Sequence, residues 1–559
     1  MKRIFLVGTI LTAAVLGFHA PRAHAQEHQH MHEPSGQLGR VKFVISCTPK
    51  AQQQFNRAVA WLHSFEYEEA ERAFAEVAVT DPHCGMAFWG IAMSNYHPLW
   101  APPSAAELQK GLGAIEKAKA VGARTPREQE YIAAIANFYA EPDKLDHRTR
   151  TLAYLNAMEQ LYRKYPGDLE ASAFYALALI TNGTMRHDKN YTSEKKAAQI
   201  LKRIQAREPQ HPGVAHYLIH GYDSPALAQL ALPAARSYAK IAPASAHAQH
   251  MPSHIFTRLG LWEEDIRSNL DAEAAAKAYA ARHSLPGAWD EQLHAMDYLA
   301  YAYLQAGQDK AAAGVLDELQ KIQQVDPSNF KVAYAFAAIP ARYALERRQW
   351  DEAAKLTLYP DASSSFPWKR FPWAEAHIHF ARAVGAARSG NADAARQEVE
   401  KLATIKNEQV GTRGDYDWAT QIEIERLVAS AWLSFAEGKH EDSLRLMREA
   451  ADLDDATEKH PVTPGAVLPA REQLGELLLA LKQPSSALPE FESSLRNTPN
   501  RFNGLLGAAR AAKLAGDLRK ASAYYGMLLK TAARGNRPEL AEAIAFRARR
   551  MPDARRAGR

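Results

Sequence analysis

Three histidines stand close together in the stretch SAHAQHMPSHIF, at His247, His250 and His254. Upstream, the stretch GVAHYLIHGYDS contains His216 and His220, which are four residues apart, as His250 and His254 are. Side chains four residues apart share one face of an α-helix, so each pair can direct two imidazole rings to one point. Imidazole nitrogen is a good ligand for copper, zinc and iron, and the pattern therefore predicts a transition-metal site.

Two more residues near these pairs are candidate ligands. Asp223 lies near the end of the stretch GVAHYLIHGYDS, and His294 is the first residue of the apolar stretch HAMDYLAYAYLQAGQ. Pro252 lies between His250 and His254, where it either kinks one helix or begins a new one. An all-histidine or His/Asp ligand set suits copper or zinc, with iron as the alternative. The chain contains no HExxH, P-loop, GxGxxG or GxSxG motif beside these residues.

A second histidine-rich stretch, QEHQHMHEP, contains His28, His30 and His32. If the chain is cleaved after Ala25, His28 becomes the third residue. A free amine, two amides and an imidazole can then surround Cu(II) or Ni(II) in a square plane. These three histidines are weaker candidate ligands, because a disordered tail with little affinity for metal explains them as well.

The first residues have the pattern of an export signal. Lys2 and Arg3 precede the apolar run 4–18, and the sequence AHA at 23–25 is a small-x-small cleavage site. We therefore expect cleavage after Ala25 and a periplasmic or secreted protein. No later stretch is apolar enough to span a membrane. The formal charge of the whole chain is +5, and much of it lies in the signal and at the C-terminus, so the body does not favour nucleic-acid binding.

The chain has two cysteines, Cys47 and Cys84. An even number of cysteines in an oxidising compartment suggests one disulfide. Free thiols, or a thiolate metal site that uses His83, are the alternatives.

Alanine-rich amphipathic segments with helical periodicity run from about residue 50 to residue 550, and strand patterns are nearly absent. The segment FEYEEAERAFAEVAVTDP (65–82) resembles a tetratricopeptide repeat (TPR). Its cadence recurs around Ala197, Ala231 and Asp265, in steps of 34 residues, and again from Ala487 to Ala521. This is the TPR period. Other units are spaced more widely, which predicts insertions or longer helices.

The resemblance implies an all-α fold, a TPR-type solenoid of helical hairpins wound in a right-handed superhelix with irregular insertions. In this family the first helix of each hairpin lines a concave groove. Both histidine pairs would then occupy equivalent positions on the first helices of adjacent repeats, and His247 and Asp223 would face the same groove. The family mostly binds protein or peptide partners, so such a partner is expected in the groove.

The sequence suggests six regions: a signal peptide (1–25), a flexible His-rich segment (26–46), N-terminal TPR-like helices (47–150), central repeats with the histidines (151–320), C-terminal repeats (321–535) and a basic tail (536–559). Three functions fit this reading. The first is an exported TPR scaffold with a copper or zinc site for metal-dependent binding or metal handling. The second is a copper or iron oxidase with the groove as substrate cleft, and the third is a metal-free module that binds peptides.

Overall fold

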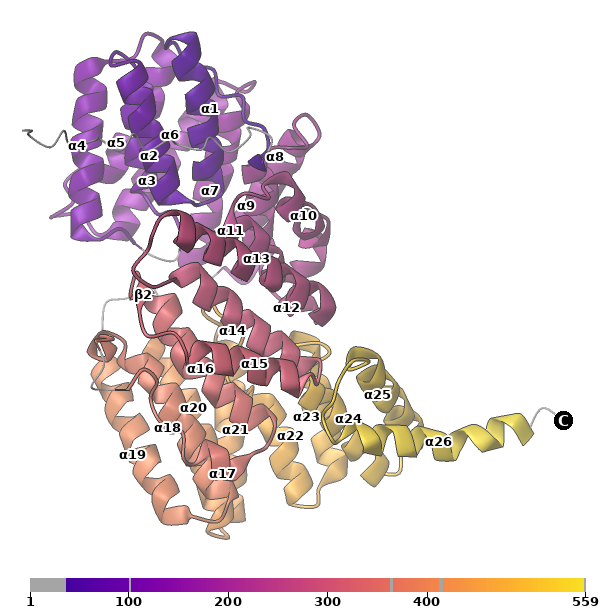
Figure 1. Cartoon of the computed structure of the whole chain (residues 1–559). Helices are drawn as coiled ribbons and strands as arrows, with labels where there is room; N and C mark the ends of the chain where they lie inside the picture. Colours follow the sequence, from indigo (N-terminus) through magenta and orange to yellow (C-terminus); the bar gives the residue numbers. More distant parts are fainter. Residues whose placement is uncertain (1–36, 100–101, 187, 362–364, 412–415, 557–559) are drawn as a thin grey trace, which may run out of the picture. The chain divides into compact units, whose positions relative to one another are not determined.

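The computed structural model describes residues 37–99, 102–186, 188–361, 365–411 and 416–556. Almost every element within these ranges is an α-helix, and consecutive helices pack as antiparallel hairpins (Figure 1). Two short strands, β1 (Ala288–Trp289) and β2 (Val325–Asp326), pair in parallel. The expected all-α solenoid of TPR-type hairpins is therefore confirmed, whereas its handedness stays a prediction.

The helices up to the histidine region are α1 (Pro49–His63), α2 (Tyr67–Thr80), α3 (Gly85–Ser94), α4 (Ala105–Val121), α5 (Pro126–Tyr139), α6 (His147–Lys164), α7 (Leu169–Arg186), α8 (Thr192–Gln205), α9 (Pro212–Tyr222), α10 (Ala228–Ile241), α11 (Ala246–His250), α12 (Pro252–Leu259), α13 (Trp262–Arg282) and α14 (Asp290–Gln305). The later helices are α15 (Asp309–Leu319), α16 (Phe330–Glu346), α17 (Trp350–Ala353), the 3₁₀ turn η2 (Trp368–Arg370), α18 (Pro372–Arg388), α19 (Ala392–Gln409), α20 (Trp418–Ala436), α21 (His440–Ala456), α22 (Ala470–Ala480), α23 (Pro484–Asn497), α24 (Phe502–Leu514), α25 (Leu518–Thr531) and α26 (Leu540–Arg556).

The small residues that define the repeat lie where two helices of a hairpin meet. Ala197, Ala231, Ala487 and Ala521 are all completely buried. Alanine lets the two helix backbones approach closely at these positions. Asp265 occupies the same register and is also completely buried, where its carboxylate accepts hydrogen bonds from the side chains of its neighbours.

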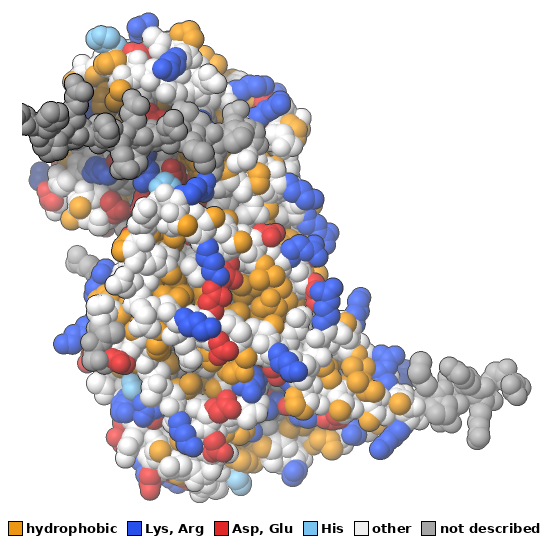
Figure 2. All heavy atoms as spheres, viewed as in Figure 1, with side chains coloured by type: hydrophobic (Ala, Val, Ile, Leu, Met, Phe, Trp, Pro, Cys, Tyr) orange, Lys and Arg blue, Asp and Glu red, His pale blue; other side chains and the backbone are white. Residues whose placement is uncertain are grey.

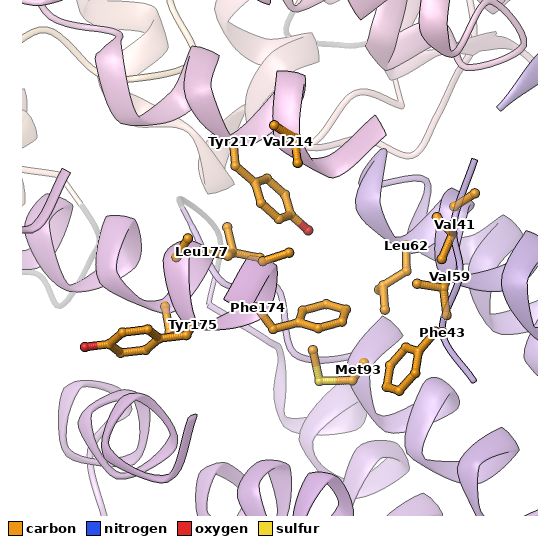
Figure 3. Packing of buried hydrophobic residues seen from close by; sticks show 14 of the residues in the cluster. Val41, Phe43, Val59, Leu62, Met93, Phe174, Tyr175, Leu177, Val214 and Tyr217 are labelled. Carbon is orange, nitrogen blue, oxygen red and sulfur yellow. The ribbon is translucent and has the colours of Figure 1, made fainter. Parts of the chain in front are cut away.

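The apolar core lies in two main clusters. One runs from Leu38 to Phe256 and the other from Trp262 to Ala521, so the core changes within the histidine region, between α12 and α13. Figure 3 shows part of the first cluster, in which Phe174, Tyr217 and the other labelled side chains come from α1, α3, α7 and α9 and from the segment before α1. The candidate site is therefore held between two extensive packed cores.

Both ends of the described chain are more ordered than the sequence suggested. Within the segment expected to be flexible (26–46), Leu38 and Phe43 are buried in the first core cluster. Residues 540–556 of the expected basic tail form α26, where Leu540 and Ala543 pack against α25. In both places apolar side chains find a packed partner, which composition alone did not reveal.

The two cysteines form a disulfide between Cys47 and Cys84, whose Cα atoms are 5.3 Å apart. None of the helices in the described ranges has the length and apolar character needed to cross a membrane. On the face shown in Figure 2, basic and acidic side chains are interspersed. The predicted signal peptide and the candidates His28, His30 and His32 lie outside the described residues.

Candidate metal centre

Six histidines from four helices gather into two groups of three. The first triad consists of His216 and His220 from α9 and His247 from α11. The second triad consists of His250 from α11, His254 from α12 and His294 from α14. In each triad, one nitrogen of every ring lies within 4.8 Å of the corresponding nitrogens of the other two. The structure thus brings together all six histidines that the sequence proposed for this region, but in two sets.

Local sequence explains how these helices are placed. Pro212 is the first residue of α9, where its missing N–H costs nothing. Ser245 caps α11, because its hydroxyl oxygen accepts a hydrogen bond from the Ala248 amide at 3.0 Å. The helix is interrupted at Met251, and Pro252 begins α12. Gly260 ends α12 with φ of +63°, a conformation that glycine adopts without strain.

The first triad is arranged around His216. Its Nε2 atom lies 2.9 Å from His220 Nε2 and 3.2 Å from His247 Nε2. Its Nδ1 atom lies 2.7 Å from the carbonyl oxygen of His63, at the end of α1. A carbonyl can only accept, so Nδ1 of His216 carries the proton and its Nε2 has a free lone pair. N–H groups of His220 and His247 can satisfy that lone pair.

The second triad has a different proton arrangement. His250 Nδ1 lies 2.7 Å from Asn269 Oδ1, and His254 Nδ1 lies 3.0 Å from Asp223 Oδ2. Both partners are acceptors, so both Nδ1 atoms carry protons. The two Nε2 atoms, 3.1 Å apart, then face each other with lone pairs only. Two buried acceptors without a donor between them are unfavourable, and a bound cation would satisfy both.

The orientation of the Asn269 amide supports this assignment. Its Nδ2 donates to the backbone carbonyl of Asp265 at 3.0 Å and to the Asp265 carboxylate at 2.7 Å. A flipped amide would place its oxygen against two acceptors. Asn269 therefore presents its oxygen to His250, and His250 must donate.

Burial keeps the rings of His216, His250 and His294 neutral. His216, His247, His250, His254 and His294 are between 0% and 6% exposed, and His220 is half-buried. Loss of hydration lowers the pKa of His216, His250 and His294 well below 6.5, and the neighbouring imidazoles lower it further. Neutral imidazole is the form that binds metal.

The spacing of the nitrogens suits metal ligation. Two nitrogens bound to one tetrahedral ion, each ~2.0–2.1 Å from it, lie about 3.3–3.4 Å apart. The observed separations of 2.9 Å, 3.2 Å and 3.1 Å are only slightly shorter. Metal-bound histidines also donate their second ring nitrogen to a carbonyl or carboxylate, and His216 and His254 do so here.

Asp223, a further candidate ligand, contacts the second triad through His254. We expected it among the ligands, but its Oδ2 accepts from His254 and its Oδ1 accepts from Arg258 Nε at 2.8 Å. Burial alone would raise its pKa, yet Lys459 and Arg258, together with His254, hold the pKa of Asp223 well below 3.8. Asp223 is therefore an ionised group that orients His254.

Aromatic side chains lie against both triads. Phe65, in the loop between α1 and α2, lies over the first triad, with its ring centroid 4.3 Å from that of His216 and 5.5 Å from that of His220. Tyr298 of α14 covers the second triad, 5.1 Å from the His254 ring. One aromatic ring thus packs directly on histidine rings of each triad.

Sequence reasoning did not identify a third buried cluster, His63, Glu170 and His211. The Glu170 carboxylate receives His63 Nε2 at 2.8 Å and His211 Nε2 at 3.2 Å, and His63 Nδ1 lies 2.8 Å from the Tyr217 hydroxyl. These nitrogens are engaged with oxygen partners rather than with one another. The cluster is best described as a structural network that fixes the His63 carbonyl beneath His216.

No protein-family model matches the chain, and no curated protein does. Solved structures of low similarity include human IFIT1 in a dimer with m7Gppp-AAAA (13% identity, covering 80% of this chain and 90% of that one, TM-score 0.37). Yeast Tom70 has 11% identity over 90% of this chain and 96% of its own (TM-score 0.34). A TPR protein from Parabacteroides merdae has 12% identity over 54% and 98% (TM-score 0.29). A likeness at this level indicates nothing about ligands or partners.

Proposed function

We propose that this chain is an exported TPR scaffold that binds a transition metal, copper or zinc, through its buried histidines. The observation that carries the proposal is the pair His250 and His254. Their Nδ1 protons are donated to Asn269 and Asp223, so the lone pairs of the two Nε2 atoms face each other at 3.1 Å. A cation between them would bind both lone pairs. The metal would serve metal handling or metal-dependent binding of a protein or peptide partner.

Elemental analysis of the purified protein tests this proposal. His28→Ala, His30→Ala and His32→Ala are introduced first, so that the N-terminal histidines contribute no metal. The comparison is then with the same protein that also carries His220→Ala and His254→Ala. Copper or zinc in near-stoichiometric amount should be present in the first protein and absent from the second. Equal metal content in both, or none in either, would refute the proposal.

A matched control is available in His440. This residue is exposed on α21 and belongs to neither triad. His440→Ala removes one imidazole from the chain and should leave the metal content unchanged. Loss of metal in this control would indicate unspecific binding to surface histidines.

A further inference from the structure

The six histidine ligands are arranged for two ions rather than one. Any two nitrogens bound to a single ion lie at most about 4.2 Å apart, which is twice the metal–nitrogen distance. The six nitrogens do not all lie within 4.8 Å of one another but gather in two separate sets of three. One ion can therefore not be bound by all six.

The two sets are nevertheless immediate neighbours. His247 and His250 both belong to α11 and lie three residues apart, yet they serve different triads. Positions with this spacing have Cβ atoms only about 5–6 Å apart. A single helical turn thus supplies one ligand to each set, and two bound ions would share one buried centre.

The metal-free triads differ in how well their hydrogen bonds are satisfied. In the first triad, His216 Nε2 can accept an N–H from His220 or His247. In the second, His250 and His254 have no proton to share between their Nε2 atoms. An ion in the second triad removes an existing penalty, whereas an ion in the first must replace a hydrogen bond.

The first triad can still take an ion after a proton shift within His247. Moving the proton from Nε2 to Nδ1 frees the Nε2 lone pair for the metal. The carboxylate of Glu291 has its Oε1 atom 3.9 Å from His247 Nδ1 and faces the proton in its new position. The net protonation of the ring does not change in this step.

We propose that the centre binds two transition-metal ions, one in each triad, and that the second triad is filled first. This inference rests on the proposed function. The first ion is coordinated by His250, His254 and His294. The second is coordinated by His216, His220 and His247. Three nitrogen ligands leave each ion an open position for a further small ligand.

The test is a zinc titration of the metal-free protein that carries the three N-terminal His→Ala substitutions. Stoichiometry is read by equilibrium dialysis with elemental analysis, and affinities by competition with a chromophoric chelator. His294→Ala removes a ligand from the second triad only, and His220→Ala removes one from the first only. His440→Ala is the control.

The parent and the control should bind two zinc ions, and each triad variant should bind one. The first step should be at least about tenfold tighter than the second, because only the metal-free second triad holds unpaired acceptors. His294→Ala should abolish the tight step, and His220→Ala should abolish the weak step.

Each other result has a definite meaning. One ion in the parent, lost in either variant, would overturn the two-ion inference and leave the proposed function standing. Two ions with the tight step lost in His220→Ala would overturn the order of filling. No zinc in the parent, together with no copper in the same titration made with copper, would refute the proposed function itself. Far-UV circular dichroism checks that each variant folds, and His294→Asn and His220→Asn replace any alanine variant that does not.

Discussion

Replacing His250 by glutamine should affect the metal-free and the zinc-bound protein in opposite ways. In the metal-free protein, His250→Gln leaves the buried Asn269 Oδ1 without its donor, which costs about 1–3 kcal/mol. The glutamine amide can donate an N–H toward His254 Nε2 and so remove two facing acceptors, each of which costs about 1–3 kcal/mol. We therefore expect the metal-free variant to be at least as stable as the parent.

Zinc should separate the two proteins. A ligand that binds only the folded state at a hundred times its dissociation constant stabilises that state by about 2.7 kcal/mol. The parent should gain this amount, and His250→Gln, which lacks a ligand of the tighter triad, should gain much less. Urea unfolding followed by circular dichroism, with EDTA or with zinc, measures both differences.

His377→Gln serves as the matched control. His377 is 2% exposed, close to the 1% of His250, and its Nδ1 lies 2.7 Å from the carboxylate of Glu425, outside the metal centre. This variant should be destabilised in EDTA and should respond to zinc as the parent does. If His250→Gln were destabilised by more than about 3 kcal/mol in EDTA and the parent ignored zinc, a proton rather than a metal would bridge the pair.

Three further predictions concern stability. Cys47→Ser with Cys84→Ser opens a loop of 37 residues and should cost about 4 kcal/mol in urea unfolding, whereas an unchanged midpoint would contradict the loop-entropy argument. Burial, with Lys459 nearby, lowers the pKa of His460 to about 3, so the folded state takes up this proton far less readily than the unfolded chain with its pKa of 6.5. The free energy of unfolding should fall as the pH drops below 6.5, and His460 alone should contribute about 1.4 kcal/mol of this loss at pH 5.5. In His460→Gln, the free energy of unfolding should fall by about that much less over the same pH range. Arg501 is completely buried between two carboxylates, so Arg501→Met should cost about 3–5 kcal/mol, and a loss below 1 kcal/mol would show that the network is dispensable.

The repeat register predicted much of the fold and the neighbourhood of the histidines. A spacing of 34 residues between His216 and His250 places them on equivalent helices of adjacent hairpins, because stacked repeats keep the same orientation. The buried alanines at Ala197 and Ala231 follow from the same periodicity. Residues related by the repeat are thus predictable from sequence, since their separation in space is set by one recurring unit.

The partners that fix the protons were not predictable in this way. The His63 carbonyl lies 153 positions from His216 in sequence, and Asn269 belongs to the second helix of a hairpin. Neither position has a periodic relation to the histidines it supports. A backbone carbonyl also leaves no trace in residue type, so only the packing of α1 against α9 reveals it.

The two triads divide at the junction of α11 and α12, next to Pro252. An uninterrupted helix would carry His247, His250 and His254 on one continuous surface. At Met251, which keeps helical dihedrals, α11 passes into α12: His250 is the last residue of α11, and His254 lies in the first turn of α12. His250 then meets His294 of the following hairpin, with ring centroids 4.1 Å apart, while His247 stays with α9.

Burial of the two triads bears on the choice between binding a peptide and binding a metal. A histidine that recognises a peptide in a groove must offer its ring to solvent before the partner arrives. Four of these rings are at most 5% exposed and are covered by Phe65 or Tyr298. A metal ion needs only neutral nitrogens and a path for one atom, and burial supplies the neutral form at physiological pH. Each triad takes its ligands from two adjacent hairpins, so a bound ion would join those two hairpins to one another, in addition to their apolar contacts and to hydrogen bonds such as that from Arg258 to Asp223.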